Sequence, residues 1–206
     1  MTSRLIPALA ALALAAGAAG ASAATTTLAG QFGDAADTAL VGSDLGVALF
    51  DNDYDIANNV ALYTLVVSVG GTVSIDSTGF GAGGADPYFT LFAGSGVGAT
   101  FVDSNYAQAF STGGDFDYSA TLAAGTYEIA LGTFANMSFA ESDGTGSLGD
   151  GFFGIGEPDS LGNGSYSLTV TTPDAPPPPV PEPAPWMLSA VGFAALALRA
   201  AKRRRR

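Results

Sequence analysis

The feature that most restricts the fold of this 206-residue chain is a set of short runs in which apolar and polar residues alternate. Tyr127, Ile129 and Leu131, for example, alternate with Glu128 and Ala130. The same period of two recurs in residues 63–69, 116–122 and 166–171. A period of two in runs rich in aromatic and β-branched residues predicts half-buried antiparallel strands.

Further strands are expected where apolar residues lie between turn-forming residues, at 45–50, 72–76, 87–92 and 101–105. The segments between the runs are rich in Gly, Asp, Asn and Ser, which favour turns. No long stretch shows the period of about 3.6 residues that marks an amphipathic helix. About seven to nine short strands at this spacing predict an all-β domain, an antiparallel β-sandwich or jelly roll, over residues 24–172. We expect it to be flanked by an N-terminal signal helix and a C-terminal hydrophobic helix.

The charged residues are distributed unevenly. All seven basic side chains lie in the first four or the last eight positions, and the chain has no His and no Cys. Of the 19 acidic residues, all except Glu182 lie between residues 34 and 174, which leaves 18 carboxylates in a stretch without Lys or Arg. Such a body repels phosphate backbones, so no nucleic-acid partner is expected. Because salt bridges cannot form within it, its carboxylates must be solvated, hydrogen-bonded to the backbone or bound to a metal.

Residues 1–23 have the layout of a secretory signal peptide. A basic start is followed by an apolar run over 5–16 and by a small-residue cleavage site at Ala21 and Ala23. Cleavage after Ala23 would leave Ala24 as the first residue of the exported chain. The alternative, a buried N-terminal helix, is disfavoured because the segment has no polar face.

The C-terminal part consists of three sections that resemble nothing upstream. Residues 173–180 include four consecutive prolines and predict an extended stem of roughly 3 Å per residue. Residues 186–198 are apolar and would span about 20 Å as a helix, compared with roughly 30 Å for a hydrocarbon core. A basic cluster closes the chain: Arg199, Lys202, Arg203, Arg204, Arg205 and Arg206. By the positive-inside rule this order places the acidic domain outside, and a permanent membrane anchor remains an alternative.

The end of the chain closely resembles the PEP-CTERM protein-sorting signal. The resemblance rests on Val180-Pro181-Glu182-Pro183-Ala184, the apolar run with Gly192, and the basic end. In that family the tail is read and removed by exosortase, a membrane-embedded enzyme of Gram-negative bacteria that make exopolysaccharide. The resemblance implies that Pro181, Glu182 and Pro183 are a recognition element and that residues 181–206 are the sorting signal. It also implies exosortase, the secretion machinery and, transiently, the membrane as partners during export.

The body of the chain resembles the β-sandwich domains related to the bacterial pre-peptidase C-terminal domain. The stretches that carry this resemblance are FDNDYDIANNVALYTLVVSVGGTVSIDS, ADPYFTLFAG, LAAGTYEIALG and LGDGFFG. They are strand and turn patterns within residues 45–171. The resemblance therefore implies a fold and leaves the activity open.

One candidate metal site stands out, the sequence DNDYD. It places four oxygen-bearing residues within five positions: Asp51, Asn52, Asp53 and Asp55. Hard oxygen ligands suit Ca²⁺, but the EF-hand pattern fails because Ile56 and Leu62 stand where Gly and Glu are required. A loop site would need further carboxylates, and the candidates are Asp86, Asp103 and Asp117. The alternative is a solvated acidic turn, so calcium is the one cofactor that the sequence suggests.

The sequence shows no catalytic constellation. A serine nucleophile would lack His or Lys as its base. Glycoside hydrolysis needs two facing carboxylates, whereas Glu128 is predicted on the polar face of a strand, and Glu141 and Glu157 in Gly-rich loops. All three are expected to be solvated surface acids. Aromatic residues that could stack on sugars if exposed are Tyr88, Phe89, Tyr106, Phe152 and Phe153, although most strand aromatics belong to a core.

The sequence therefore predicts an exported, non-enzymatic protein of the cell surface or extracellular matrix. Before processing, residues 181–206 would hold it in the membrane, and after processing it would lie outside the cell. Its expected work is structural or adhesive. The alternative is a carbohydrate- or calcium-binding module that acts on exopolysaccharide, and a secreted hydrolase is the least favoured reading.

Overall fold

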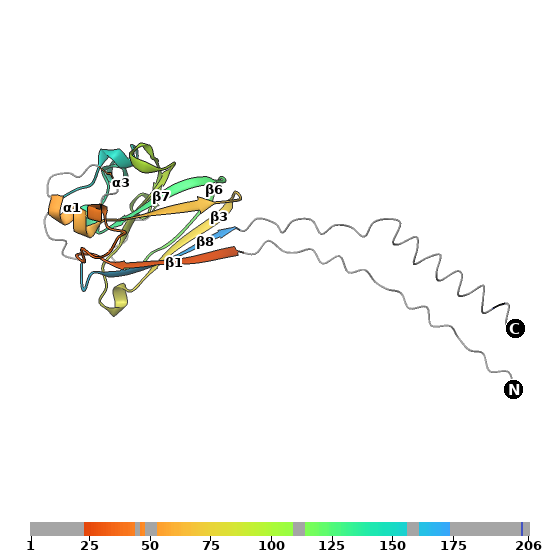
Figure 1. The fold of residues 1–206 in the computed structure, drawn as a ribbon, viewed down its shortest axis with the longest axis horizontal. Coiled ribbons are helices and arrows are strands. Elements are labelled where there is room, and N and C mark those ends of the chain that lie inside the picture. Colours follow the sequence, from red (N-terminus) through yellow and green to blue (C-terminus); the bar gives the residue numbers. More distant parts are fainter. Residues whose placement is uncertain are drawn as a thin grey trace, which may run out of the picture. The chain divides into compact units, whose positions relative to one another are not determined.

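The computed structural model describes residues 23–43, 46–47, 53–108, 114–155 and 161–173, together with Arg203. Strands dominate this part (Figure 1): β1 (Ala23–Gln31), β2 (Ala61–Val67), β3 (Gly71–Thr78), β4 (Tyr88–Ala93), β5 (Thr100–Ser104), β6 (Asp117–Leu122), β7 (Gly125–Gly132) and β8 (Ser165–Pro173). They form two four-stranded sheets, with the orders β1-β8-β3-β6 and β2-β7-β4-β5. Every pairing is antiparallel, so the predicted all-β sandwich is confirmed. The two flanking helices that the sequence predicts, in the signal peptide and the C-terminal tail, lie outside the described residues.

Most strands lie close to their predicted positions. The alternation is clearest in β6, where Tyr118 and Leu122 are buried and Asp117 is exposed. Two expectations need correction. The predicted strand at 101–105 ends one residue early, because Asn105 begins a helix. In the predicted strand at 45–50, the described residues 46 and 47 belong to no strand, and the others lie outside the described residues.

The main core lies between the two sheets, where the inward-facing residues of both meet. Phe89 and Ile129 from the second sheet and Ile75 and Leu168 from the first are completely buried there. The ring of Phe89 stacks on that of Phe116, with the ring centroids 4.9 Å apart. Burial of each such side chain contributes about 1.5–3 kcal/mol relative to exposure, so this layer stabilises the sandwich.

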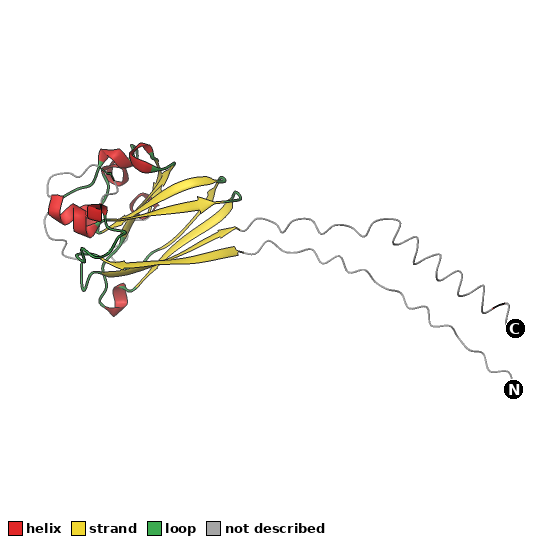
Figure 2. Ribbon diagram, viewed as in Figure 1, coloured by secondary structure: helices red, strands yellow, loops and turns green. Residues whose placement is uncertain are grey.

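Short helices and 3-10 turns lie mainly at one end of the strands, where they cover the outer face of the second sheet (Figure 2): α1 (Asp53–Asn59), α2 (Asn105–Gln108), α3 (Phe139–Asp143), η1 (Val41–Ser43), η3 (Gly96–Gly98), η4 (Phe134–Asn136) and η5 (Leu148–Asp150). One further 3-10 turn, η2 (Phe80–Ala82), lies apart from them. A second apolar cluster forms beneath the covering helices, including Ile56, Phe92 and Phe152. Both faces of β7 are therefore buried, and the expectation that Glu128 and Ala130 lie on a solvated face is wrong. Helices of seven residues or fewer leave too little periodic sequence to be predicted.

Two tyrosine hydroxyl groups link the sheets near one edge. Tyr63 on β2 and Tyr166 on β8 lie with their hydroxyl oxygens 2.9 Å apart. The Tyr166 hydroxyl donates onward to Asp37 at 3.1 Å, so Tyr63 donates to Tyr166. Glycine is required at position 30, because a Cβ there would collide with both Tyr166 and Asp37.

The chain enters and leaves the sandwich at the same end. Ala23, the first residue of β1, pairs with Pro173, the last residue of β8. The register then continues without a shift to Gln31 opposite Ser165. In Figure 1 these two strands lie side by side, and α1 and α3 lie at the other end of the domain.

Candidate functional site

The acidic side chains of the domain are held mainly by backbone amides. Asp37 accepts from two backbone amides at 2.9 and 3.0 Å, and Asp115 accepts from two more and from a serine hydroxyl. The buried Asp86 accepts from one backbone amide at 2.7 Å. These donors satisfy carboxylate oxygens that have no basic side chain to pair with. The sequence-based expectation of backbone partners is confirmed for these three residues.

The described residues include only part of the predicted calcium site. Asp51 and Asn52 lie outside the described residues, and the side chains of Asp53 and Asp55 are not described. The backbone of Asp53 and Asp55 belongs to α1, so the expected acidic turn is a helix at these positions. Among the described side chains, no group of three or more His, Cys, Asp or Glu residues is placed to hold a metal ion.

The three carboxylates considered as further ligands lie in separate environments. Asp86 caps a backbone amide, as described above. Asp103 accepts from the hydroxyl of Tyr118 at 3.2 Å. Asp117 faces Asp76 across the β3–β6 pair. The fold gives Asp86 and Asp103 separate hydrogen-bond partners and does not gather the three residues into one site.

Glu141 is the described carboxyl whose environment differs most from the prediction. It was expected in a solvated loop, but it lies in α3 and is only 2% exposed. Ser138 caps this helix by accepting from the Glu141 backbone amide at 2.9 Å, and Gly144, with φ of 69°, ends it. Both are residues that commonly cap helices. The helix therefore forms over the sheet and carries the Glu141 side chain inward.

Three residues form a closed set of hydrogen bonds, here called the polar ring: Thr90, Ser138 and Glu141, with the Glu141 backbone N–H completing it by donating to Ser138. Thr90, on the outer face of β4, donates to Glu141 Oε2 at 2.9 Å. Its oxygen lies 2.7 Å from the Ser138 hydroxyl, which therefore donates to it. Glu141 Oε1 has no hydrogen-bond partner of good geometry among the described residues.

Glu141, the carboxyl group of the polar ring, has a raised pKa. Burial raises the pKa of the Glu141 carboxyl from its ordinary 4.5 to about 8, although the Thr90 hydroxyl and the backbone amide of Tyr106 act in the opposite direction. At neutral pH the carboxyl is therefore mainly protonated. The sequence does contain a signal for this site, because Ser138 and Glu141 match the S-x-x-E capping box.

The carboxylates considered for hydrolysis are not shown as a pair. Glu128 is buried on β7 and accepts from the Thr64 hydroxyl at 3.2 and 3.3 Å, whereas Glu141 binds Thr90. Glu157 lies outside the described residues. Both described glutamates were expected to be solvated, and both expectations are wrong because short helices and loops cover the second sheet.

The aromatic residues considered as sugar-stacking platforms are mostly unavailable. Tyr88, Phe89 and Phe152 are buried, so the expectation that they could be exposed is wrong. Phe153 is half-buried and packs against Phe139 with ring centroids 4.2 Å apart, and Tyr106 is also half-buried. The alternating pattern places strand aromatics in the core, as most aromatics in strands are.

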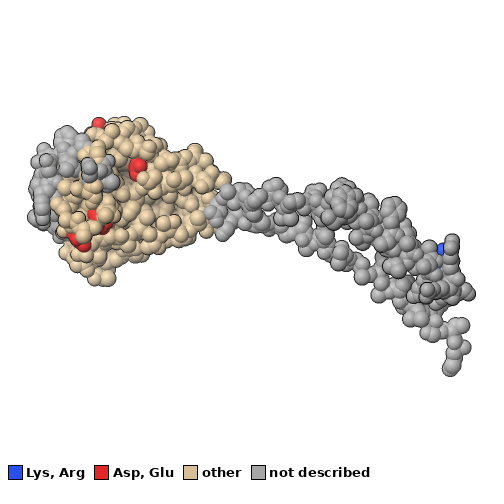
Figure 3. All heavy atoms as spheres, viewed as in Figure 1, with Lys and Arg blue, Asp and Glu red and all other residues tan. Residues whose placement is uncertain are grey.

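Three neighbouring strands form a surface that we call the uncharged flank: β1, β8 and β2. Their sequences, AATTTLAGQ, SYSLTVTTP and ALYTLVV, contain no charged residue. On the face shown in Figure 3, the carboxylates lie toward the end with the helices, and the other half of the domain shows none. In a body with 18 carboxylates, such a surface is the part where another acidic molecule meets least repulsion.

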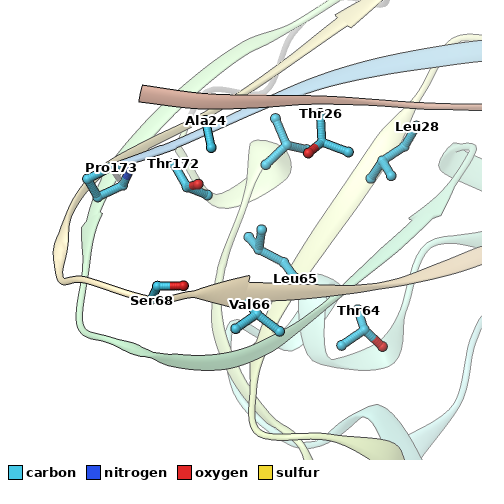
Figure 4. Close-up of a pocket in the computed structure, with 10 residues that line it drawn as sticks. Ala24, Thr26, Leu28, Thr64, Leu65, Val66, Ser68, Thr172 and Pro173 are labelled. Atoms are coloured by element: carbon cyan, nitrogen blue, oxygen red, sulfur yellow. The ribbon is translucent and has the colours of Figure 1, made fainter. Parts of the chain in front are cut away.

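A groove of about 370 Å³ runs along this flank, between the edges of the two sheets. Thr26 and Leu28 of β1 point across it toward Leu65 of β2 (Figure 4). Its other lining residues are also uncharged: Ala24, Thr64, Val66, Ser68, Val170, Thr172 and Pro173. Val66 is 61% exposed. The groove contains no aromatic ring, so it suits an uncharged, partly apolar occupant better than a stacked sugar.

Sequence reasoning missed the uncharged flank because β1 was not predicted as a strand. Alanine is depleted in strands, and the three consecutive threonines at 25–27 do not show a period of two. The available signal was the absence of charged residues between Ala23 and Asp34.

The predicted sorting residues lie almost entirely outside the described residues. These are Ala21, Pro181, Glu182, Pro183, Arg199, Lys202, Arg204, Arg205 and Arg206. Arg203 is described and exposed, and Ala23 and Ala24 begin β1. The contacts divide the chain into a compact unit, Gly20–Ala175, and a second unit made of its two ends, Met1–Ala19 and Pro176–Arg206. Within the described residues, no helix has the length and apolar character needed to cross a membrane.

No protein-family model matches the chain, and no curated protein is significantly similar to it.

Proposed function

We propose that this chain is an exported, non-enzymatic protein of the cell surface or extracellular matrix, and that its sandwich domain does adhesive or structural work. The sequence supports export through the signal peptide of residues 1–23. Residues 181–206 support sorting by an exosortase system through their resemblance to the PEP-CTERM signal.

The uncharged flank is the observation that supports adhesion. An edge strand offers backbone donors and acceptors to an incoming strand, and pockets beside it can take alternate side chains. In this domain β1 provides the edge, and the groove lined by Leu28 and Leu65 provides apolar surface beside it. This combination is typical of a surface that binds another polypeptide.

The export part of the proposal is tested by intact-mass analysis of the chain from the surface and medium fractions of a producing bacterium. We expect a chain that begins near Ala24 and lacks everything beyond the region of Pro181–Pro183. Retention of Arg203–Arg206 on the surface protein would overturn exosortase sorting and favour a permanent anchor.

The adhesive part is tested by deleting the gene and measuring cell aggregation and cohesion of the matrix. We expect both to fall, and expression of the full chain to restore them. Aggregation and cohesion equal to those of the parent cells would contradict adhesive work.

A further inference from the structure

The outer side of β1 differs from the other sheet edges of the domain. β1 pairs with β8 along all nine of its residues, and among the described residues no strand pairs with its other side. In an antiparallel pair, backbone N–H and C=O groups point alternately to the two sides of the strand. About half of the backbone groups of β1 are therefore directed away from β8.

Each of the other three edge strands carries a feature that hinders pairing. β6 begins with the exposed Asp117. β5 includes Asp103, has an irregular register against β4, and receives a bridge from Ser147 on its outer side. The first residues of β2 are covered by residues 39 and 40, through a bridge to Ala61 and a backbone hydrogen bond at 2.8 Å.

β1 carries little of the protection that proteins give an edge: among the described contacts, only its last residue is capped, where the Gln31 backbone N–H donates to the Asp37 carboxylate at 2.9 Å. Charged residues, proline, bulges and short length are the usual means of protection. β1 is uncharged, contains no proline, keeps one register and is longer than the usual five or six residues. A strand of this kind is a template for the addition of another strand.

We infer that the partner of β1 is β1 of a second copy of this chain, paired antiparallel across a two-fold axis. Overlap of residues 24–30, which remain after the predicted cleavage and leave out the capped Gln31, places Thr27 opposite Thr27 of the second copy, and Thr26 opposite Leu28 of the second copy. Threonine pairs are favourable in directly opposed positions, and no charge meets another. The grooves of the two copies then adjoin across the axis, because Thr26 and Leu28 line them.

Charge favours this flank over the rest of the surface for contact between two copies. Residues 24–180 have 18 carboxylates and no Lys or Arg, so copies that meet elsewhere bring like charges together. Among the described strands, those of the uncharged flank allow two copies to meet without this repulsion over a length of about 30 Å. The symmetric arrangement also closes on itself, as a two-fold interface does.

The pairing has a consequence for adhesion that rests on the proposed function. Ala23 and Pro173 lie at one end of the domain, since they are opposed in the β1–β8 pair. Antiparallel pairing of β1 with its copy puts these ends on opposite sides of the joined sheet. The chain therefore leaves the two copies, beyond Pro173, at opposite ends of the joined sheet, so the dimer would join two oppositely placed attachment points.

The chain has no Cys, so single cysteines provide a direct test of the pairing. In the protein recovered from the surface fraction, Thr27→Cys should cross-link to itself with a short bismaleimide. Gln31→Cys should not, because the two Gln31 positions would be about 27 Å apart along the strands. A mixture of Thr25→Cys and Ala29→Cys should give the mixed dimer, because these positions are directly opposed when Thr27 faces Thr27. Self-linking of Gln31→Cys would show parallel pairing and overturn the inference.

Sedimentation measures the strength of the association. We expect the unmodified chain to form dimers, and Thr27→Glu to raise the dissociation constant about tenfold or more by opposing two carboxylates. The matched control is Thr121→Glu, which adds the same charge to an exposed position on β6, the other edge of the same sheet. Near-ultraviolet circular dichroism verifies that both variants remain folded.

The outcomes separate this inference from the proposed function. A monomeric chain with no self-linking of Thr27→Cys would reject a second copy as the partner, while the deletion experiment would still judge adhesion. If the chain forms dimers in solution but cells that carry Thr27→Glu aggregate normally, the β1 pair does not join two attachment points, and that part of the inference is rejected. Loss of both dimers and aggregation in Thr27→Glu, with Thr121→Glu unaffected, is the expected result.

Discussion

Replacement of Glu141 by glutamine should change the dependence of stability on pH. In the folded protein burial raises the pKa of Glu141 to about 8, whereas its ordinary value is 4.5. The stabilising effect of its protonated form is thus complete below about pH 4.5 and is lost as the pH rises through about 8. Glutamine has a similar shape, stays neutral, and can still accept from Thr90.

The magnitude follows from the difference between the two pKa values. Between them the folded state holds one proton that the unfolded state has released, which costs a little over 1 kcal/mol per pH unit. Over the whole interval from 4.5 to 8 the loss is about 5 kcal/mol. Glu141→Gln should therefore have nearly the stability of the parent chain at pH 4.5 and clearly exceed it at pH 8.

Urea unfolding of the parent chain and the variant at several pH values between 4 and 9 measures this difference. The matched control is Asp143→Asn, which removes one carboxylate from the exposed end of the same helix. We expect the control to follow the parent chain. A constant difference between Glu141→Gln and the parent chain across this range would show that Glu141 titrates normally and would refute the reasoning.

Two further substitutions test contacts elsewhere in the sandwich. Tyr166→Phe should lower the free energy of unfolding by about 1–3 kcal/mol, because it removes the hydroxyl that joins Tyr63 to Asp37. Denaturant unfolding measures this loss, and a loss no larger than that of Tyr127→Phe, which removes one hydrogen bond to a backbone carbonyl, would contradict it. Asp117→Asn should raise stability by about 0.5 kcal/mol at low salt, because Asp117 faces Asp76 across the sheet. The gain should shrink as salt screens the pair, and a gain that is independent of salt would point to another cause.

The sequence predicted both the strand and its buried side only where a strand has one clearly apolar side. In β6 and β8 the buried residues occupy every second position, so local periodicity and final burial agree. In β7 and β4 the agreement fails, because residues on both sides are buried. The second side is covered by α1 and α3, which are too short to predict and come from distant parts of the chain.

The polar ring and the uncharged flank also depend on contacts between distant segments, which the sequence does not reveal. Ser138 and Glu141 fit a capping pattern, but nothing in the sequence brings Thr90, 48 residues away from Ser138, into contact with them. For β1, strand identity comes from its pairing with β8, which follows at the far end of the domain. Local propensity is weak in AATTTLAGQ, and long-range backbone pairing overrides it.

The sequence by itself determined the all-β class, the positions of most strands, the absence of basic partners and the reliance of carboxylates on the backbone. These properties depend on local periodicity and composition, which are present in the chain before it folds. Only the tertiary structure decided that Glu141 is buried, that both faces of the second sheet are covered, and that β1 forms an exposed, uncharged edge. Burial and pairing depend on which distant segments meet, because a side chain loses water only when another part of the chain replaces it.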